Sequence, residues 1–387
     1  MNGMPLSAAS TPLRVLLLCT NLARGGAETQ VALLAGALHR RGMDVCVVSL
    51  LEPSAYAEEL RAAGVPVHSL GMRPGRPSVA GMLRLVFLLR RFRPAVLHAH
   101  LFHANLLARL VRLLCPVPMV VSTIHSMAES GRDSANATNR DRLYRLTDWL
   151  SDRSVCVSRA VAGRHVGAGA ISTGRLAVIP NGLDPARFVL PLETRERVRA
   201  SLGLGDGFVW LAAGRLMWKK DYGTLLEAMA RLPEATLLIA GDGPLSKELR
   251  TLAQPLGERV RFLGLREDVA ELMLASDGFV LSSVVEGLPM VLMEAAMTGL
   301  PSVATDVGGV GEVVRQGETG FVVPPQDPAA LAAAMQSLAA MPVAERHRLG
   351  DAARRHACAH LDLDAVAAEW ENLYRDGVRR AAGALEP

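Results

Sequence analysis

The chain has 387 residues, of which half are apolar and 21% are charged, and its formal net charge is +4. This length suits two domains of roughly 180 residues, each able to bury a core, and no stretch reaches the roughly 18 uncharged apolar residues of a membrane span. We therefore expect a cytoplasmic chain. Its five scattered cysteines form no CxxC pair, so we predict that they are reduced packing residues rather than disulfides: Cys19, Cys46, Cys115, Cys156 and Cys358.

The charge is divided unevenly between the two halves. Residues 1–185 carry 21 arginines, no lysine and 11 acids, whereas residues 186–387 carry 21 basic and 27 acidic residues. A basic N-terminal half suits anionic lipid headgroups, a lipid diphosphate or nucleic acid. With 8 Phe, 4 Tyr and no alternation of basic and aromatic residues, a platform for single-stranded nucleic acid is unsupported. We expect an anionic acceptor or a contact with an anionic membrane, and no nucleic acid.

The first half opens with a strand and a glycine-rich loop. Val15–Cys19 is strand-like, and Gly25 and Gly26 precede a helix with an apolar face formed by Val31, Leu34, Ala35 and Leu38. Glycines at a helix start let the backbone approach a ligand closely, and the helix N-terminus favours phosphate. A purely structural tight turn is the alternative. Val45–Leu50 is the next predicted strand.

The segment Val79–Arg93 is apolar but contains four arginines, of which Arg84 and Arg91 fall on one helix face. Such a helix would rest on an anionic membrane, or it is a core helix with solvated arginines. Downstream, His98 and His100 have the H-x-H spacing of some zinc sites, but no acid or cysteine cluster completes a ligand set. We expect His100 and Asn105 to line the acceptor side instead.

His125 follows the strand-like Met119–Ile124, which places it at the carboxyl edge of the predicted sheet. A structural histidine is the alternative to a ligand-binding one. The polar segment Ser126–Arg142, with Arg132 and Arg140, is predicted to be a loop that closes over the acceptor. Ile179–Pro185 is rich in turn formers and marks the expected domain boundary.

The second half repeats the layout of the first. Phe208–Ala212 is strand-like, Gly214–Lys220 is a loop, and Asp221 is a plausible N-cap for a helix over Tyr222–Arg231. Arg215 and Lys220 thus stand between a strand end and a helix start, where two cations would hold a diphosphate and stabilise the charge that develops as it departs. Alternating strands and helices predict two doubly wound parallel sheets, with a ligand cleft at their facing strand ends.

Two glutamates eight residues apart carry the strongest signal. Gly278–Leu281 reads as a buried strand and Pro289 suits a first helical turn, so Glu286 would lie at a strand's carboxyl edge and Glu294 inside the following helix. Carboxylates accept hydrogen bonds from sugar hydroxyls, and a helix N-terminus suits phosphate. The pattern therefore predicts a sugar-nucleotide site. A solvated helix face with two acids is the alternative.

Two further segments complete the reading. Gly308 and Gly309 precede a helix-like Glu312–Gln316 and would place N–H groups near the nucleotide, although packing explains them equally well. The tail has an aromatic apolar face that needs cover, made of Val366, Trp370, Leu373 and Tyr374.

These motifs, in this order, resemble the retaining glycosyltransferases of the GT4 type, which have the two-domain GT-B fold. The resemblance covers about residues 13–375 and rests on Gly25-Gly26, Arg215 with Lys220, Glu286 with Glu294, and Gly308-Gly309. It implies an N-terminal Rossmann-like acceptor-binding domain over 1–185 and a nucleotide-sugar-binding domain over 186–362. It also implies that the helix in 363–387 crosses back to the first domain.

The resemblance also implies roles. Glu286 would bind hydroxyls of the transferred sugar, His125 would reach that sugar, and Arg215 and Lys220 would hold the diphosphate. Glu294 would bind the ribose, and Gly26, Gly308 and Gly309 would line the donor site. The implied reaction is a front-face displacement in which the departing phosphate takes the acceptor's proton. It uses no metal and no cofactor beyond the nucleotide-sugar co-substrate, a UDP- or GDP-sugar, and its acceptor is a glycan or a lipid-linked glycan in polysaccharide or glycolipid synthesis.

Two departures and three alternatives stand beside this reading. Glu286 precedes Gly287 where many relatives have a Phe-Gly pair, which leaves the sugar open, and Trp218 is unusual in the phosphate loop. A GT-B sugar-nucleotide epimerase shares the fold but would need acid/base carboxylates that we cannot assign. A nicotinamide-dependent oxidoreductase would need G-x-G-x-x-G after the first strand, which is missing. A non-catalytic partner of a glycan-assembly complex would be marked by loss of the charged motif residues, which are present.

Overall fold

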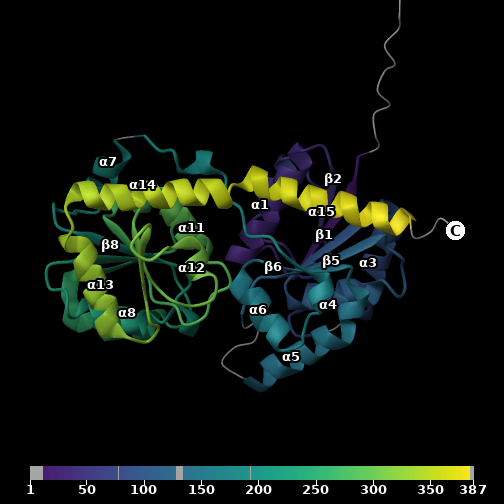
Figure 1. Cartoon of the computed structure of the whole chain (residues 1–387), viewed down its shortest axis with the longest axis horizontal. Coiled ribbons are helices and arrows are strands. Elements are labelled where there is room, and N and C mark those ends of the chain that lie inside the picture. The colour runs from purple at the N-terminus through teal and green to yellow at the C-terminus, as the bar shows by residue number, and fades with distance from the viewer. Residues whose placement is uncertain (1–11, 77, 128–133, 192, 384–387) are drawn as a thin grey trace, which may run out of the picture.

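The computed structural model describes residues 12–76, 78–127, 134–191 and 193–383. Their strands form two separate parallel sheets, each flanked by helices on both faces (Figure 1). The first sheet has seven strands in the order β3 (Val67–Ser69), β2 (Asp44–Ser49), β1 (Arg14–Cys19), β4 (Val96–His100), β5 (Met119–Ile124), β6 (Arg153–Cys156) and β7 (Leu176–Val178). Because the order reverses at β1, this sheet is doubly wound, as predicted.

Successive side chains of β1 point to opposite faces of the first sheet, and each face is covered by different helices. Leu16 and Leu18 pack with α3 (Val79–Phe92) and α4 (Phe102–Val111). Leu17 and Cys19 pack with helices on the opposite face, α1 (Gly26–Arg40) and α2 (Ala57–Ala62). Beyond them lie α5 (Ser134–Thr147), α6 (Arg159–Gly167) and the short 3-10 helices η1 (Asp148–Leu150), η2 (Thr173–Arg175) and η3 (Pro185–Phe188).

The second sheet has the same winding with six strands, in the order β10 (Val260–Gly264), β9 (Thr236–Ala240), β8 (Val209–Ala213), β11 (Gly278–Leu281), β12 (Ser302–Thr305) and β13 (Gly320–Val323). One face packs on α8 (Tyr222–Met229), α9 (Ser246–Ala253) and α13 (Pro328–Ala340). The other packs on α10 (Val269–Ala275), α11 (Met290–Met297), α12 (Val310–Val313) and α14 (Val343–His360). The remaining elements are α7 (Thr194–Ser201), η4 (Trp218–Lys220) and η5 (Gln254–Arg259).

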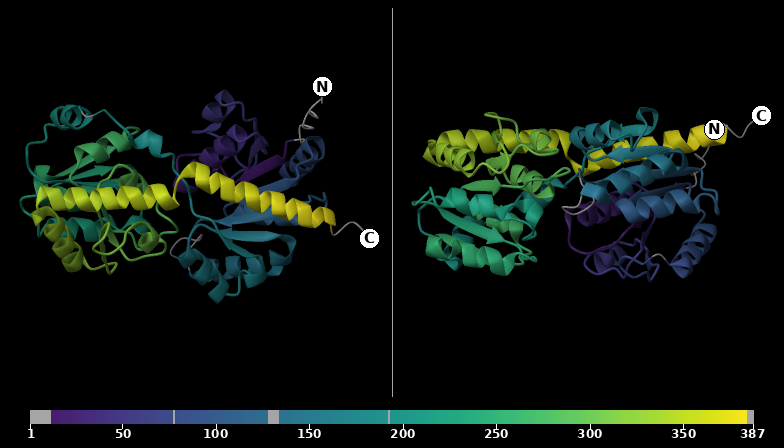
Figure 2. Two further views of the ribbon diagram at one scale, coloured as in Figure 1. Left: turned by 45° about the horizontal axis from the view of Figure 1, so that its top comes forward. Right: turned by 90° about the horizontal axis from the view of Figure 1, so that it is seen from below.

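The last helix joins the two halves. Helix α14 packs on the second half of the chain, and the next helix, α15 (Leu363–Gly383), packs on the first half against α1 and β5 (Figures 1 and 2). Its aromatic face is buried in the core that α1 and β1 form, with Trp370 and Tyr374 at the centre. Burial of that face explains why it carries large aromatic side chains. The domain limits at residues 185 and 362 remain predictions.

Four local expectations differ from the structure. The predicted loop Ser126–Arg142 is helical from Ser134 onward, in α5, while Arg132 lies outside the described residues. Pro289 is the N-cap of α11 rather than part of its first turn. Asp221 has left-handed backbone angles and its carboxylate accepts from the Thr224 hydroxyl, so it makes no side-chain cap. The helix expected over 312–316 is the single turn α12.

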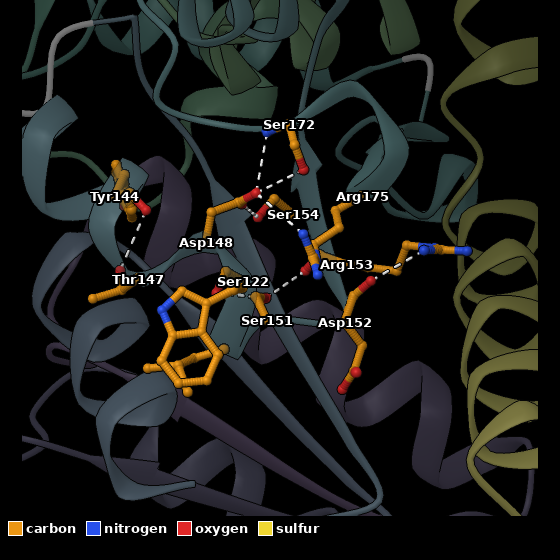
Figure 3. A network of polar contacts seen from close by, with 12 residues as sticks. Ser122, Tyr144, Thr147, Asp148, Ser151, Asp152, Arg153, Ser154, Ser172 and Arg175 are labelled. Atoms are coloured by element: carbon orange, nitrogen blue, oxygen red, sulfur yellow. Dashed lines mark hydrogen bonds and ion pairs between the residues drawn. The ribbon is translucent and has the colours of Figure 1, made fainter. Parts of the chain in front are cut away.

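A buried polar network supports the β5–β6 side of the first sheet (Figure 3). The Asp148 carboxylate accepts hydrogen bonds from the Ser172 amide at 3.1 Å and hydroxyl at 2.7 Å, and from the Ser154 hydroxyl at 3.3 Å. Arg109, fully buried, donates to Ser154 and Ser122. Because a buried charge requires such partners, the network stabilises the amino-terminal side of β5 and β6, on the edge of the sheet opposite the carboxyl strand ends. Within the described residues no helix is both long and apolar enough to cross a membrane.

Candidate active site

The carboxyl edges of the two sheets meet at the junction of the two halves. At this junction the start of α1 lies beside the start of α11, and a Cβ added to Gly26 would lie 3.2 Å from the Met290 side chain. Nearby, a Cβ on Gly287 would collide with the carbonyl oxygen of His125. Glycines therefore let the two backbones approach closely where the sequence predicts a ligand.

An ion pair lies at the carboxyl end of β11. Lys220 Nζ donates to Glu286 Oε1 at 2.6 Å, and the Ser283 hydroxyl donates to the same oxygen, also at 2.6 Å. The two charged side chains are only 19% and 11% exposed. Two donors on Oε1 orient the carboxylate and leave Oε2 to accept from another hydroxyl. The structure thus brings two predicted site residues into direct contact, 66 positions apart in the sequence.

Two glycines, Gly214 and Gly241, allow the tight backbone packing of the loop that carries Arg215. Gly214 has φ +148°, and Gly241 packs so closely on it that a Cβ there would overlap the Gly214 carbonyl. Arg215 is exposed and faces Glu28 of α1 across the junction. Burial raises the pKa of the Glu28 carboxyl, and the Arg215 charge opposes this effect. A cation on one half and a helix start on the other therefore face the same space.

Gly308 and Gly309 serve packing at this junction. Gly308 has φ +56°, and a Cβ on it would collide with the Glu286 carbonyl. The Gly309 N–H donates to the Gly287 carbonyl at 2.8 Å, and the Ser158 hydroxyl of the first half donates to the same oxygen at 3.1 Å. The amide of Gly309 is thus engaged with the protein in this arrangement rather than directed at a phosphate. Both glycines hold the Glu286 loop in place.

Histidines form a connected group at the edge of the first sheet. His100 Nδ1 lies 3.0 Å from His125 Nε2, and the His98 and His100 rings are in tilted contact with their centroids 4.0 Å apart. His98 in turn contacts Tyr374 of α15 and Thr123, both at 2.6 Å. Burial lowers the pKa of His125 to about 4 and holds those of His98 and His100 well below their usual value. The three rings are therefore neutral near pH 7.

The polar atoms of this group are not all satisfied. Among the described residues, His100 Nε2 and His125 Nδ1 are buried and have no hydrogen-bond partner, and the same holds for Asn105 Oδ1. Since the two histidines share one hydrogen bond, one of their outer nitrogens carries a proton and the other a lone pair. Among the described residues no three His, Cys, Asp or Glu side chains meet in an arrangement that could hold a metal ion.

Glu294 lies apart from the ion pair, inside α11. Burial raises its pKa to about 7, and the charge of Arg187 in η3 acts in the opposite direction. Within the described residues its carboxylate accepts no side-chain hydrogen bond, so its acceptor capacity is available to a ligand.

Three residues at the site were not singled out from the sequence. Ser283 orients Glu286, and Arg187 lowers the energy of an ionised Glu294. Glu312 accepts from the backbone amide of Arg159 at 2.8 Å, which ties the second half to the start of α6. Of the three, only Ser283 could have been predicted from the sequence, because a hydroxyl three residues before a predicted ligand-binding acid can reach the carboxylate of that acid.

Both halves of the chain are similar to known proteins. Residues 24–187 match the family described as Glycosyltransferase Family 4, and residues 207–341 match the family described as Glycosyl transferases group 1. The glycogen synthase of Mycobacterium tuberculosis is 32% identical over 301 residues, which are 74% of this chain and 69% of that protein.

Two further similarities extend the comparison. The UDP-Gal:alpha-D-GlcNAc-diphosphoundecaprenol alpha-1,3-galactosyltransferase of Escherichia coli is 28% identical over 259 residues, 62% of this chain and 65% of the relative, so the match spans just under two thirds of it. HepE of Anabaena, solved in complex with UDP-glucose, superposes with a TM-score of 0.82 at 22% identity, over 96% of this chain and all of that chain. This likeness confirms the GT-B fold.

Proposed function

Since the chain belongs to the group 1 glycosyltransferases of family 4, we propose that it transfers a sugar from a nucleotide-sugar donor to a glycan or lipid-linked acceptor, with retention of anomeric configuration. The observation that carries this proposal is the Lys220–Glu286 pair, oriented by Ser283 and placed opposite the start of α1. A cation and a helix N-terminus suit a diphosphate, while the free carboxylate oxygen suits a sugar hydroxyl.

The roles follow from these placements. Lys220 and Arg215 would hold the diphosphate and stabilise the charge that grows on it as the bond breaks. Glu286 would accept from hydroxyls of the transferred sugar, and the neutral His125 would exchange hydrogen bonds with the same sugar. Glu294 would accept from the ribose hydroxyls. Glu286 would act as a hydrogen-bond acceptor and not as a nucleophile, because the proposed front-face displacement forms no covalent enzyme intermediate.

The proposed step conserves atoms and charge. The bond between the anomeric carbon and the phosphate oxygen breaks, and its electron pair stays on the phosphate. The acceptor hydroxyl oxygen forms a new bond to the anomeric carbon on the same face, and its proton passes to the departing phosphate oxygen. The protein contributes orientation and electrostatic stabilisation, with no covalent enzyme intermediate and no metal.

Two names among the compared proteins support the choice of substrates. HepE is described in complex with UDP-glucose, and the Escherichia coli relative is named for a UDP-sugar donor and a diphosphoundecaprenol-linked acceptor. A UDP-sugar and a lipid-diphosphate glycan are therefore the first donor and acceptor to try. We place the reaction in polysaccharide or glycolipid synthesis.

A binding screen followed by product analysis tests the proposal. Thermal unfolding of the purified protein is compared with UDP, GDP, ADP, NAD and their sugar conjugates, because a ligand at about 100 times its Kd stabilises the fold by roughly 2.7 kcal/mol. The anomeric configuration of the glycoside formed is then read by NMR. A product of inverted configuration would contradict the mechanism, and conversion of the donor alone to an epimer would favour the epimerase.

The variant Glu286→Gln separates binding from turnover. It keeps the side chain's size, so nucleotide-induced stabilisation should persist while kcat falls by about 100-fold or more, the range for loss of a group that positions substrate. Ser201→Ala, on a helix of the second half distant from the junction, is the control and should leave both measurements unchanged. Full turnover in Glu286→Gln would remove this residue from the site.

A further inference from the structure

Helix α3 presents an apolar stripe to solvent. Val79, Leu83 and Phe87 recur every fourth residue, so they lie on one face, and they are 79%, 63% and 64% exposed. The opposite face is buried in the core through Leu85 and Leu89. This helix is therefore anchored to the sheet on one side, and its outer face needs no internal partner to hold it.

The stripe is bordered by arginines. Arg91 continues the same four-residue series, and Arg84 and Arg90 lie beside it; all three are exposed. Beyond the helix end, an open hollow is lined by Arg14, Arg93 and apolar residues that include Leu114. The stripe, its arginines and this hollow are called the α3 surface below.

The sequence around the α3 surface contains no negative charge. From residue 60 to residue 128 there are nine arginines and neither an Asp nor a Glu. Within the described residues, Arg84, Arg90, Arg91 and Arg93 form no ion pair. Arg84 donates to the Leu70 carbonyl at 2.7 Å, while Arg90, Arg91 and Arg93 lie beside apolar side chains that water solvates poorly.

We propose that the α3 surface docks on an anionic lipid bilayer. Apolar side chains at the centre with arginines at the border are what an interfacial helix requires, because the former enter the boundary between headgroups and acyl chains while the latter pair with lipid phosphates. The α3 helix begins on the same side of the first sheet as the carboxyl strand ends, where the candidate site lies. The helix ends at the opposite, amino-terminal edge of the sheet, where Arg14 and the hollow lie, so the docked helix would run from one edge to the other.

Charge favours lipid over a second copy of the chain. In a twofold dimer the same patch meets itself, so arginines would face arginines, and residues 60–128 offer no acid to separate them. An anionic bilayer supplies the missing negative charge over its whole surface. This docking does not depend on glycosyl transfer, and either proposal can fail without the other.

Sedimentation with vesicles tests the docking. The protein is mixed, in the absence of any donor, with vesicles of phosphatidylcholine alone or with about 30% phosphatidylglycerol. We expect binding to the anionic vesicles that weakens as salt rises, and little binding to the neutral ones. Equal binding to both compositions, or to neither, would overturn the proposal.

Matched variants locate the contact. Phe87→Glu should abolish most of the binding, whereas Leu265→Glu, equally exposed in the second half at 72%, should leave it unchanged. Neutralising Arg90 and Arg91 with glutamine should weaken the partition by about 25-fold, at about fivefold for each arginine. Neutralising Arg231 and Arg348 in the second half is the control for charge.

Light scattering measures the oligomeric state and so tests whether the α3 surface is a self-association interface instead. If the chain is a dimer that Phe87→Glu converts to monomers, and vesicles do not bind it, then the α3 surface is a self-association interface and the bilayer proposal is wrong. Because Phe87 and Leu265 are both exposed, the variants should unfold at the temperature of the parent protein. An equal loss of vesicle binding in Leu265→Glu would also refute the assignment.

Discussion

The most informative perturbation is the titration of Glu294, with Glu294→Gln as the reference. Burial holds the pKa of this carboxyl at about 7, so close to half of it is protonated at neutral pH. If the ionised carboxylate accepts hydrogen bonds from the ribose hydroxyls, a nucleotide binds the ionised form preferentially. Binding must then release a proton, and affinity must depend on pH.

The expected change in nucleotide affinity with pH follows from the pKa of Glu294. With a pKa of about 7, roughly one molecule in eleven is ionised at about pH 6, whereas nearly all are ionised at about pH 8. A ligand that binds the ionised form alone should therefore bind about tenfold more weakly at about pH 6 than at about pH 8. The Gln variant cannot ionise, so this part of the pH dependence should disappear in it.

Isothermal titration calorimetry with UDP makes the measurement. The diphosphate has a titration of its own in this range, but it contributes equally to the parent protein and to Glu294→Gln, so the ratio of their pH dependences isolates the carboxyl. Repeating the titrations in two buffers with different ionisation enthalpies counts the protons released. If the parent protein and the variant lose the same affinity on acidification, Glu294 does not bind the nucleotide in its ionised form.

The same shift has a consequence for stability. A carboxyl whose pKa is raised on folding binds more protons in the folded than in the unfolded chain between about pH 4.5 and about pH 7. The free energy of unfolding must therefore fall as pH rises through this window, by at most about 3 kcal/mol and by less because the side chain is partly exposed. Urea unfolding of the ligand-free protein should show this decline, and Glu294→Gln should remove it.

Three further predictions concern the junction and the last helix. Lys220→Ala should weaken UDP binding by about 10- to 100-fold, the usual worth of a charge-assisted hydrogen bond, while the affinity for uridine changes little; equal losses for both ligands in calorimetry would discard the phosphate role. Gly287→Ala should lower turnover and the melting temperature, because its methyl group meets the His125 carbonyl, whereas Gly311→Ala on the neighbouring α12 has open space and should be tolerated in both assays. Trp370→Ala should destabilise the protein by about 3 to 5 kcal/mol in urea unfolding, and a loss below about 1 kcal/mol would show that α15 is not held by its aromatic face.

Periodicity in the sequence was sufficient for the fold class. Strands such as β1 and β11 are continuous apolar runs, because a parallel sheet is buried on both faces, and each is followed by a turn and an amphipathic helix. Local chemistry also placed Glu286 at a strand end and Glu294 inside the next helix, as the structure has them. These features depend on neighbours in the chain, so they can be read from it.

Local patterns failed where a contact distant in sequence decides the outcome. The polar composition of residues 134–142 indicated a loop, yet this segment is helical because α5 packs against α4. The structure also shows that Gly308 and Gly309 permit the close approach of the Glu286 loop, the packing role that the sequence left open beside a donor-site role. Propensity is a weak guide to such segments, since tertiary packing overrides it.

The sequence by itself determined the two doubly wound sheets and the residue types of a sugar-nucleotide site, because apolar periodicity and short motifs are local properties. Only the tertiary structure decided that Lys220 and Ser283 share one oxygen of Glu286, that His125 is linked through His100 and His98 to the last helix, and that Glu294 is buried enough to titrate near neutrality. Distances between strand ends and the loss of water around a carboxyl arise only when segments far apart in the chain pack together.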